Sequence, residues 1–145
     1  MKNQKSEIMK LNYYISFVFS SLLFSLSSCS HSDNPERNKA YDEMMAIHDE
    51  VMPEMGTIHR LEKGLKKKIE NTSSPDSLVM IKATLQRLSD SGDSMMDWMH
   101  NLDVPGKKVP DDEAIAYLKL ERDKISTVST RMKKSIESSK ALLGQ

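Results

Sequence analysis

The chain has 145 residues, which is enough for one domain of ordinary size, and its 21 basic residues balance its 21 acidic residues. A formal net charge of zero excludes a global field that would recruit nucleic acid or anionic lipid. Glycine and proline number five each and aromatic residues make up 6%, a composition that favours helices over sheet. Eleven methionines are the unusual feature.

Residues 1–28 have the features of an export signal. Three lysines precede an uncharged apolar run at 11–26, which leads into Leu26-Ser27-Ser28-Cys29. That tetrapeptide resembles the lipobox of bacterial lipoproteins, and the resemblance implies cleavage before Cys29 and attachment of a diacylglyceryl group to its sulfur. An uncleaved signal anchor is the alternative, although the apolar run is shorter than the ~20 residues that usually span a membrane.

Cys29 is the only cysteine, so the mature domain has neither a disulfide nor a thiolate site. Ser30, rather than aspartate, follows it, which by analogy with enteric lipoproteins fits sorting to the outer membrane. We therefore predict a protein that is anchored in the cell envelope by lipid and faces the periplasm, with residues 29–36 as a polar tether.

Three apolar stripes at helical spacing follow the tether. They predict helices over about 37–70, 75–102 and 111–143. Ser74 followed by Pro75 has the order typical of an N-cap and a first helical position. Because short connections make neighbouring helices antiparallel, residues 37–145 are predicted to form an all-α, antiparallel up-down-up three-helix bundle of the coiled-coil type.

One proline and two glycines disturb this regularity. Pro53 lies inside the first predicted helix, where it removes one backbone hydrogen bond. We expect a kinked but continuous helix there, with a break into two shorter helices as the alternative. Gly56 and Gly92 are expected to lie opposite each other and to let the two helix backbones approach closely.

Methionine and histidine gather in two segments, 44–55 and 95–100. Antiparallel pairing across the 71–76 turn brings these segments to one height, with His48 level with Met99. Thioether and imidazole groups without thiolate suit Cu(I). One hypothesis is therefore a copper site shared by the first two helices, with these ligands: His48, Met52, Met96, Met99 and His100.

Methionine also lines adaptable binding surfaces and fills irregular cores. The leading prediction is a groove between helices that docks a partner helix or peptide of an envelope protein, lined by Met44, Met45, Met55, Met95 and Trp98. Two further interpretations stay open. The cluster is either core packing with partly exposed histidines, or a sink for oxidants, because exposed methionines oxidise reversibly.

Three stretches of the chain have a recognisable pattern. They are Met-x-x-His-Asp-Glu-Val-Met-Pro-Glu-Met-Gly at 45–56, Met-Met-Asp-Trp-Met at 95–99, and the helix that follows Pro110-Asp111-Asp112-Glu113. They resemble a family of small bacterial lipoproteins that is often labelled "viral A-type inclusion protein". The resemblance covers nearly the whole mature chain and implies no activity, cofactor or catalytic residue.

Enzymatic chemistry has no visible basis in the sequence. No serine or cysteine nucleophile lies in a recognisable setting, and carboxylates at helical spacing are ordinary on a helix surface. The lysine run at 66–68 has no aromatic neighbours that would stack on bases. We therefore predict a non-enzymatic binding or scaffold module without a nucleic-acid partner.

Overall fold

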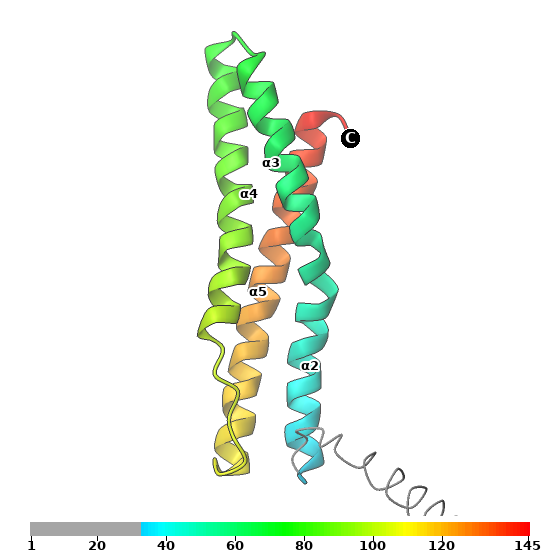
Figure 1. Ribbon diagram of the computed structural model, residues 1–145, viewed down its shortest axis with the longest axis vertical. Helices are drawn as coiled ribbons and strands as arrows, with labels where there is room; N and C mark the ends of the chain where they lie inside the picture. Colours follow the sequence, from blue (N-terminus) through cyan, green and yellow to red (C-terminus); the bar gives the residue numbers. More distant parts are fainter. Residues whose placement is uncertain (1–32) are drawn as a thin grey trace, which may run out of the picture. The chain divides into compact units, whose positions relative to one another are not determined.

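The computed structural model describes residues 33–145, and this part of the chain contains helices and no strand (Figure 1). In chain order the elements are α2 (Pro35–Val51), a 3-10 turn η2 (Met52–Glu54), α3 (Met55–Glu70), α4 (Pro75–Asn101) and α5 (Asp111–Leu143). The all-helical prediction is confirmed for these residues. The predicted signal segment at 1–28 and the lipidated Cys29 lie outside the described residues.

Local signals explain where the helices begin. Asn34 is the N-cap of α2, and its side-chain oxygen accepts hydrogen bonds from the backbone N–H groups of Glu36 and Arg37. The helix therefore starts at Pro35, before the predicted boundary, and takes in the last residues of the predicted tether. The predicted N-cap at Ser74 is confirmed, with its hydroxyl accepting from the N–H of Ser77.

The 3-10 turn η2 at Pro53 divides the first predicted helix into α2 and α3, so the structure has the alternative of two shorter helices rather than the favoured continuous one. Proline lacks the N–H that would bond to the carbonyl four residues earlier, and the backbone tightens into η2 at this point. Met52 and Glu54 keep right-handed helical dihedral angles, so α3 continues directly from the turn. Figure 1 shows α3 following directly on α2 and slanting toward α4, which it meets at the turn between them.

The two pieces have different main neighbours. α2 packs chiefly on α5, whereas α3 packs chiefly on α4 and also contacts α5. α4 and α5 lie against each other along much of their length. The backbones of α2 and α4 approach each other little, and the side-chain rings of His48 and Trp98 meet between the two helices.

The core follows the predicted apolar stripes. Its fully buried members include Val51, Ile58, Leu61, Leu65, Ile81, Leu88, Leu118 and Ile125, with Met44, Met95 and Met132 among them. The predicted close approach at paired glycines is wrong for Gly56, where an added Cβ would meet open space. The tight contact lies instead at Gly64, where a Cβ would stand 3.0 Å from a methyl carbon of Leu143.

Candidate functional site

The predicted partner groove is not an open surface. Met44 and Met95 are fully buried and Trp98 is 7% exposed, because these side chains fill the space between α2, α4 and α5. Met45 and Met55 are partly buried and pack against the same core. This part of the methionine cluster is therefore core packing, one of the interpretations that the sequence left open.

Trp98 is the centre of a polar network that joins three helices. Its ring lies 5.9 Å from the His48 ring of α2, tilted by 34°. Its indole N–H donates a hydrogen bond of 2.9 Å to a carboxylate oxygen of Glu121 in α5. The other oxygen of Glu121 accepts a hydrogen bond of 2.6 Å from Lys124, and this bond raises the pKa of the lysine. We call His48, Trp98, Glu121 and Lys124 the Trp98 network.

Sequence reasoning missed the buried carboxylate in this network. Glu121 is 5% exposed and lies at helical spacing between Leu118 and Ile125, on the apolar stripe of α5. An acidic residue on such a stripe is the signal that could have found it, because a buried charge needs a partner. The predicted level of His48 is close to the observed one, since its contact Trp98 is next in sequence to the predicted Met99.

The predicted copper ligands fall into separate places. Met96, Met99 and His100 line an open hollow of about 450 Å³ on α4, together with Asp97. His48 and Met52 do not line it. The His48 ring lies on Trp98 with its Nδ1 2.8 Å from a carboxylate oxygen of Asp49, and Met52 packs partly against the core.

The hollow therefore contains two thioethers and one imidazole from a single helix. Met96 is 48% exposed and Met99 is 38% exposed, so both side chains can be reached from the solvent. Between residues 33 and 145, no group of three or more His, Cys, Asp or Glu side chains is placed to hold a metal ion. A metal bound here would depend on the methionines. We call Met96, Asp97, Met99 and His100 the α4 surface.

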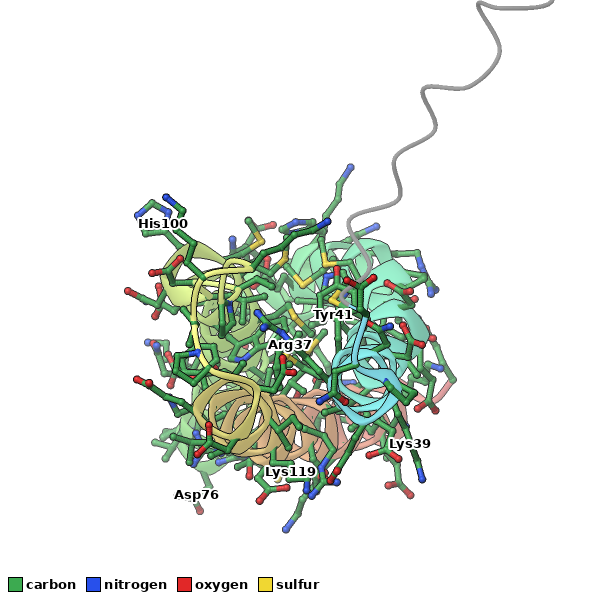
Figure 2. The ribbon with its side chains drawn as sticks, turned by 90° about the horizontal axis from the view of Figure 1, so that it is seen from below. Arg37, Lys39, Tyr41, Asp76, His100 and Lys119 are labelled. Carbon is green, nitrogen blue, oxygen red and sulfur yellow. The ribbon has the colours of Figure 1, made fainter. Side chains whose placement is uncertain are left out.

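Arg37, a second buried polar residue, connects the start of α2 to the loop between α4 and α5. Arg37 donates hydrogen bonds to the backbone carbonyls of Pro105, Gly106 and Val109, at 2.7, 2.9 and 3.2 Å, and to Asp111 at 3.1 Å. Figure 2 shows its side chain directed into the middle of the bundle, whereas His100 lies at the outer edge. These contacts, which we call the Arg37 clamp, hold the α4–α5 loop against α2.

Asp111, the first residue of α5, also takes part in the Arg37 clamp. Its second carboxylate oxygen accepts a hydrogen bond of 2.9 Å from the Asn34 side chain. Hydrogen bonds from Asn34 and from Arg37 lower the pKa of the Asp111 carboxyl below its usual value. The clamp therefore links the cap of α2 to the start of α5 through charged and neutral hydrogen bonds.

Comparisons with protein-family models, with curated proteins and with solved structures give no match. None of the described helices is long and apolar enough to cross a membrane. The class of protein is therefore defined by the geometry of the described residues alone. It is an all-helical bundle whose core contains two charged groups, Arg37 and Glu121, each held by partners from other helices or loops.

Proposed function

We propose that this chain is a lipid-anchored cell-envelope protein that acts as a non-enzymatic binding module, attached to the outer membrane and facing the periplasm. The support for the anchor is the order of features in the sequence: lysines, an apolar run at 11–26 and Cys29 in a lipobox-like setting. α2 begins six residues after that cysteine, so few residues separate the first helix from the proposed point of attachment in the sequence.

The proposed topology is an up-down-up bundle in which α2 and α3 together form the first arm. Contacts between α4 and α5 support this, because Ser91 meets Ser135 while Trp98 meets Glu121, as expected for helices that run in opposite directions. Contacts between α2 and α5 pair Glu36 with Lys119 and Glu50 with Lys133, as expected for helices that run in the same direction.

The α4 surface is the binding surface that the geometry supports best. Met96 and Met99 are exposed although the core beneath them is already filled by Met95 and Trp98, so folding does not require them to be apolar. Methionine side chains adapt their shape to a partner. The exposure of these two side chains beside His100 is the observation that carries the proposal.

Charge indicates what kind of partner fits. We define the tether half of the bundle as residues 33–54 and 93–130, which contain 15 acidic and 7 basic residues. The α4 surface belongs to this half and includes the exposed Asp97, and the exposed Asp93 and Asp103 lie within four residues of it in the sequence. An apolar patch with an acidic border is complementary to an amphipathic segment whose apolar residues are flanked by lysine or arginine. We propose such a segment of an envelope protein as the partner.

Site-specific cross-linking in cells tests this surface. A photoreactive side chain placed at Met99 is expected to give one discrete adduct, and the captured segment is expected to be basic and amphipathic. The same side chain at Val79, which is exposed near the other end of α4, is the matched control and is expected to give no such adduct. Equal adducts at both positions, or an acidic captured segment, would contradict the proposal.

Lipid attachment has its own test. Changing Cys29 to serine is expected to abolish incorporation of a fatty-acid analogue and to leave an unprocessed precursor, because the acyl group is attached to the cysteine sulfur. Labelling of the precursor and mature forms on gels measures this directly. Changing Ser28 to alanine keeps a small residue before the cysteine and is expected to leave labelling intact. Persistent labelling of the Cys29→Ser chain would remove the anchor from the proposal.

A copper-binding function is the second candidate, and it rests on the set Met96, Met99 and His100 alone. Cu(I) titrated against a competing chelator is expected to bind the wild-type chain and to bind the Met96→Leu, Met99→Leu double variant at least about tenfold more weakly, since thioethers are the soft ligands here. His48→Ala combined with Met52→Leu is the control and is expected to bind as wild type. Loss of binding in that control alone would contradict this ligand set.

A further inference from the structure

A separate groove lies between α4 and α5, in the half of the bundle that contains the 71–74 turn. It has a volume of about 320 Å³ and is lined by Arg87, Asp90, Ser91, Ser94, Arg131, Lys134, Ser135 and Ser138. We call it the serine groove. Three cationic side chains, four hydroxyls and one carboxylate therefore converge on one space, which is within the usual size range of small-molecule sites.

The cations of the serine groove are available to a ligand. Within residues 33–145, neither the Arg131 guanidinium nor the Lys134 ammonium has a hydrogen-bond or ion-pair partner. Arg87 donates one hydrogen bond of 3.0 Å to the Thr84 hydroxyl, which orients its guanidinium and leaves its other N–H groups free to donate. Unpaired guanidinium and ammonium groups beside each other are the usual partners of phosphate oxygens.

The hydroxyls of the groove, by contrast, offer acceptors. Ser94 and Ser138 donate their hydrogens to the backbone carbonyls of Asp90 and Lys134. The Ser91 and Ser135 oxygens lie 2.7 Å apart, and each is also within hydrogen-bond distance of a carbonyl of its own helix. Acceptors within the protein therefore use both of their hydrogens, and one of the two oxygens accepts from the other where they bond to each other. The lone pairs of these oxygens remain, and a ligand that donates hydrogen bonds to them must itself have hydroxyl or N–H groups.

Asp90 adds one more acceptor at the rim. One of its carboxylate oxygens accepts a hydrogen bond of 2.7 Å from Gln86, and the second is not used in this way. A carboxylate repels a bare phosphate but accepts hydrogen bonds from neighbouring hydroxyl groups. The groove is therefore complementary to a ligand that has both a phosphate and several hydroxyl groups.

The charge around the groove supports the same ligand class. The turn half of the bundle, residues 55–92 and 131–145, contains 11 basic and 5 acidic residues. This excess attracts anions, whereas the tether half is acidic. The net charge of the whole chain conceals the difference, since the two halves nearly cancel.

We propose that the serine groove binds the phosphate ester of a polyol, either as a soluble sugar phosphate or as a phosphorylated headgroup. No aromatic side chain lines the groove, which disfavours nucleic acid, because bases are usually held by stacking. Ser135 lies 24 residues beyond the start of α5, or about 36 Å along the helix, so the groove is far from the end of the bundle at which α2 begins. This inference is independent of the α4 surface.

Calorimetric titration of the full chain in detergent tests the proposal with inositol monophosphate, inositol and inorganic phosphate. Inositol monophosphate is expected to bind most tightly, because it alone uses both the cations and the hydroxyl acceptors. Arg131→Gln combined with Lys134→Gln is expected to weaken its binding at least about tenfold, as loss of two charged hydrogen bonds does. Circular dichroism of each variant verifies that the fold is intact.

The matched control removes the same charge elsewhere in the turn half. Lys63→Gln combined with Lys66→Gln changes two exposed lysines of α3 and is expected to alter binding by less than about threefold. An equal loss of affinity in both double variants would overturn the site, because the positive charge of the whole turn half, rather than the groove, would then explain the binding. Equal affinity for inorganic phosphate and for the ester would overturn the claim that the groove recognises the polyol. Tighter binding of a DNA oligonucleotide would overturn the claim that the ligand is a polyol phosphate.

Two further outcomes identify the source of the phosphate while supporting the site. A short-chain phosphatidylinositol phosphate that stays dissolved is compared with inositol monophosphate. Tighter binding of the lipid, lost in the Arg131→Gln, Lys134→Gln variant, assigns the groove to a lipid headgroup. Equal binding of the two, also lost in that variant, assigns it to a soluble ester.

Discussion

Replacing Trp98 with alanine is expected to lower the free energy of unfolding of residues 33–145 by about 3–5 kcal/mol, the range for truncating a buried tryptophan. The change empties the space between α2, α4 and α5, since Trp98 is 7% exposed and contacts the His48 ring. It also leaves Glu121 with Lys124 as its remaining partner in the network. Urea denaturation followed by circular dichroism measures the loss.

Two variants separate the parts of this effect. Trp98→Phe keeps an aromatic ring but removes the indole N–H, so we expect a smaller loss of about 1–3 kcal/mol from the unsatisfied Glu121 oxygen. Met99→Ala, at the exposed neighbour, is expected to cost less than about 1 kcal/mol. A Trp98→Ala loss as small as that of Met99→Ala would mean that the three helices do not meet at Trp98.

Replacing Arg37 with alanine is expected to lower the free energy of unfolding by about 3 kcal/mol or more. The side chain is buried, and its removal leaves Asp111 and the carbonyls of the α4–α5 loop without their donors. Arg37→Lys is expected to recover little, because an ammonium group cannot donate along the two directions that the guanidinium uses. Arg122→Ala breaks an exposed pair with Glu43 and is expected to cost less than about 1 kcal/mol.

Acid titration gives a second readout of the clamp. The pKa of Asp111 is lowered in the folded chain, so its contribution to stability is present above its usual pKa of 3.8 and is lost as the pH falls through the lowered pKa. Without Arg37 the pKa of Asp111 is lowered less, and this acid-dependent contribution is expected to shrink. An unchanged acid dependence in Arg37→Ala would contradict the clamp.

The sequence predicted the first residues of α2, α4 and α5 to within a few positions. Ser74 followed by Pro75, and Pro110 followed by acidic residues, are local signals that act on the backbone of their own turn. The sequence showed that Pro53 would disturb the first helix. The favoured prediction was a kinked continuous helix, whereas the structure has a 3-10 turn there. Whether a proline kinks a helix or gives a 3-10 turn depends on how the flanking segments pack, and here α2 and α3 pack on different neighbours.

The residues that the sequence grouped into one candidate site lie in different surroundings in the structure. Met95 and Met96 are adjacent in sequence, yet the first is fully buried and the second is 48% exposed. Both lie near the edge of an apolar stripe, where exposure is decided by which neighbouring helix covers the position. His48 was placed at the right height, but the tilted ring of Trp98, rather than a metal-binding set, occupies the space beside it.

What the sequence by itself determined is local: the helical elements, most of the apolar core and the charge of each segment, because these depend on spacing along one chain. The tertiary structure alone decided which polar groups are buried. Arg37 is buried because Pro105, Gly106, Val109 and Asp111, distant in sequence, accept its hydrogen bonds. Glu121 is buried because Trp98 and Lys124 hold its carboxylate. A buried charge is stable only where such partners converge, and that convergence is a property of the assembled bundle.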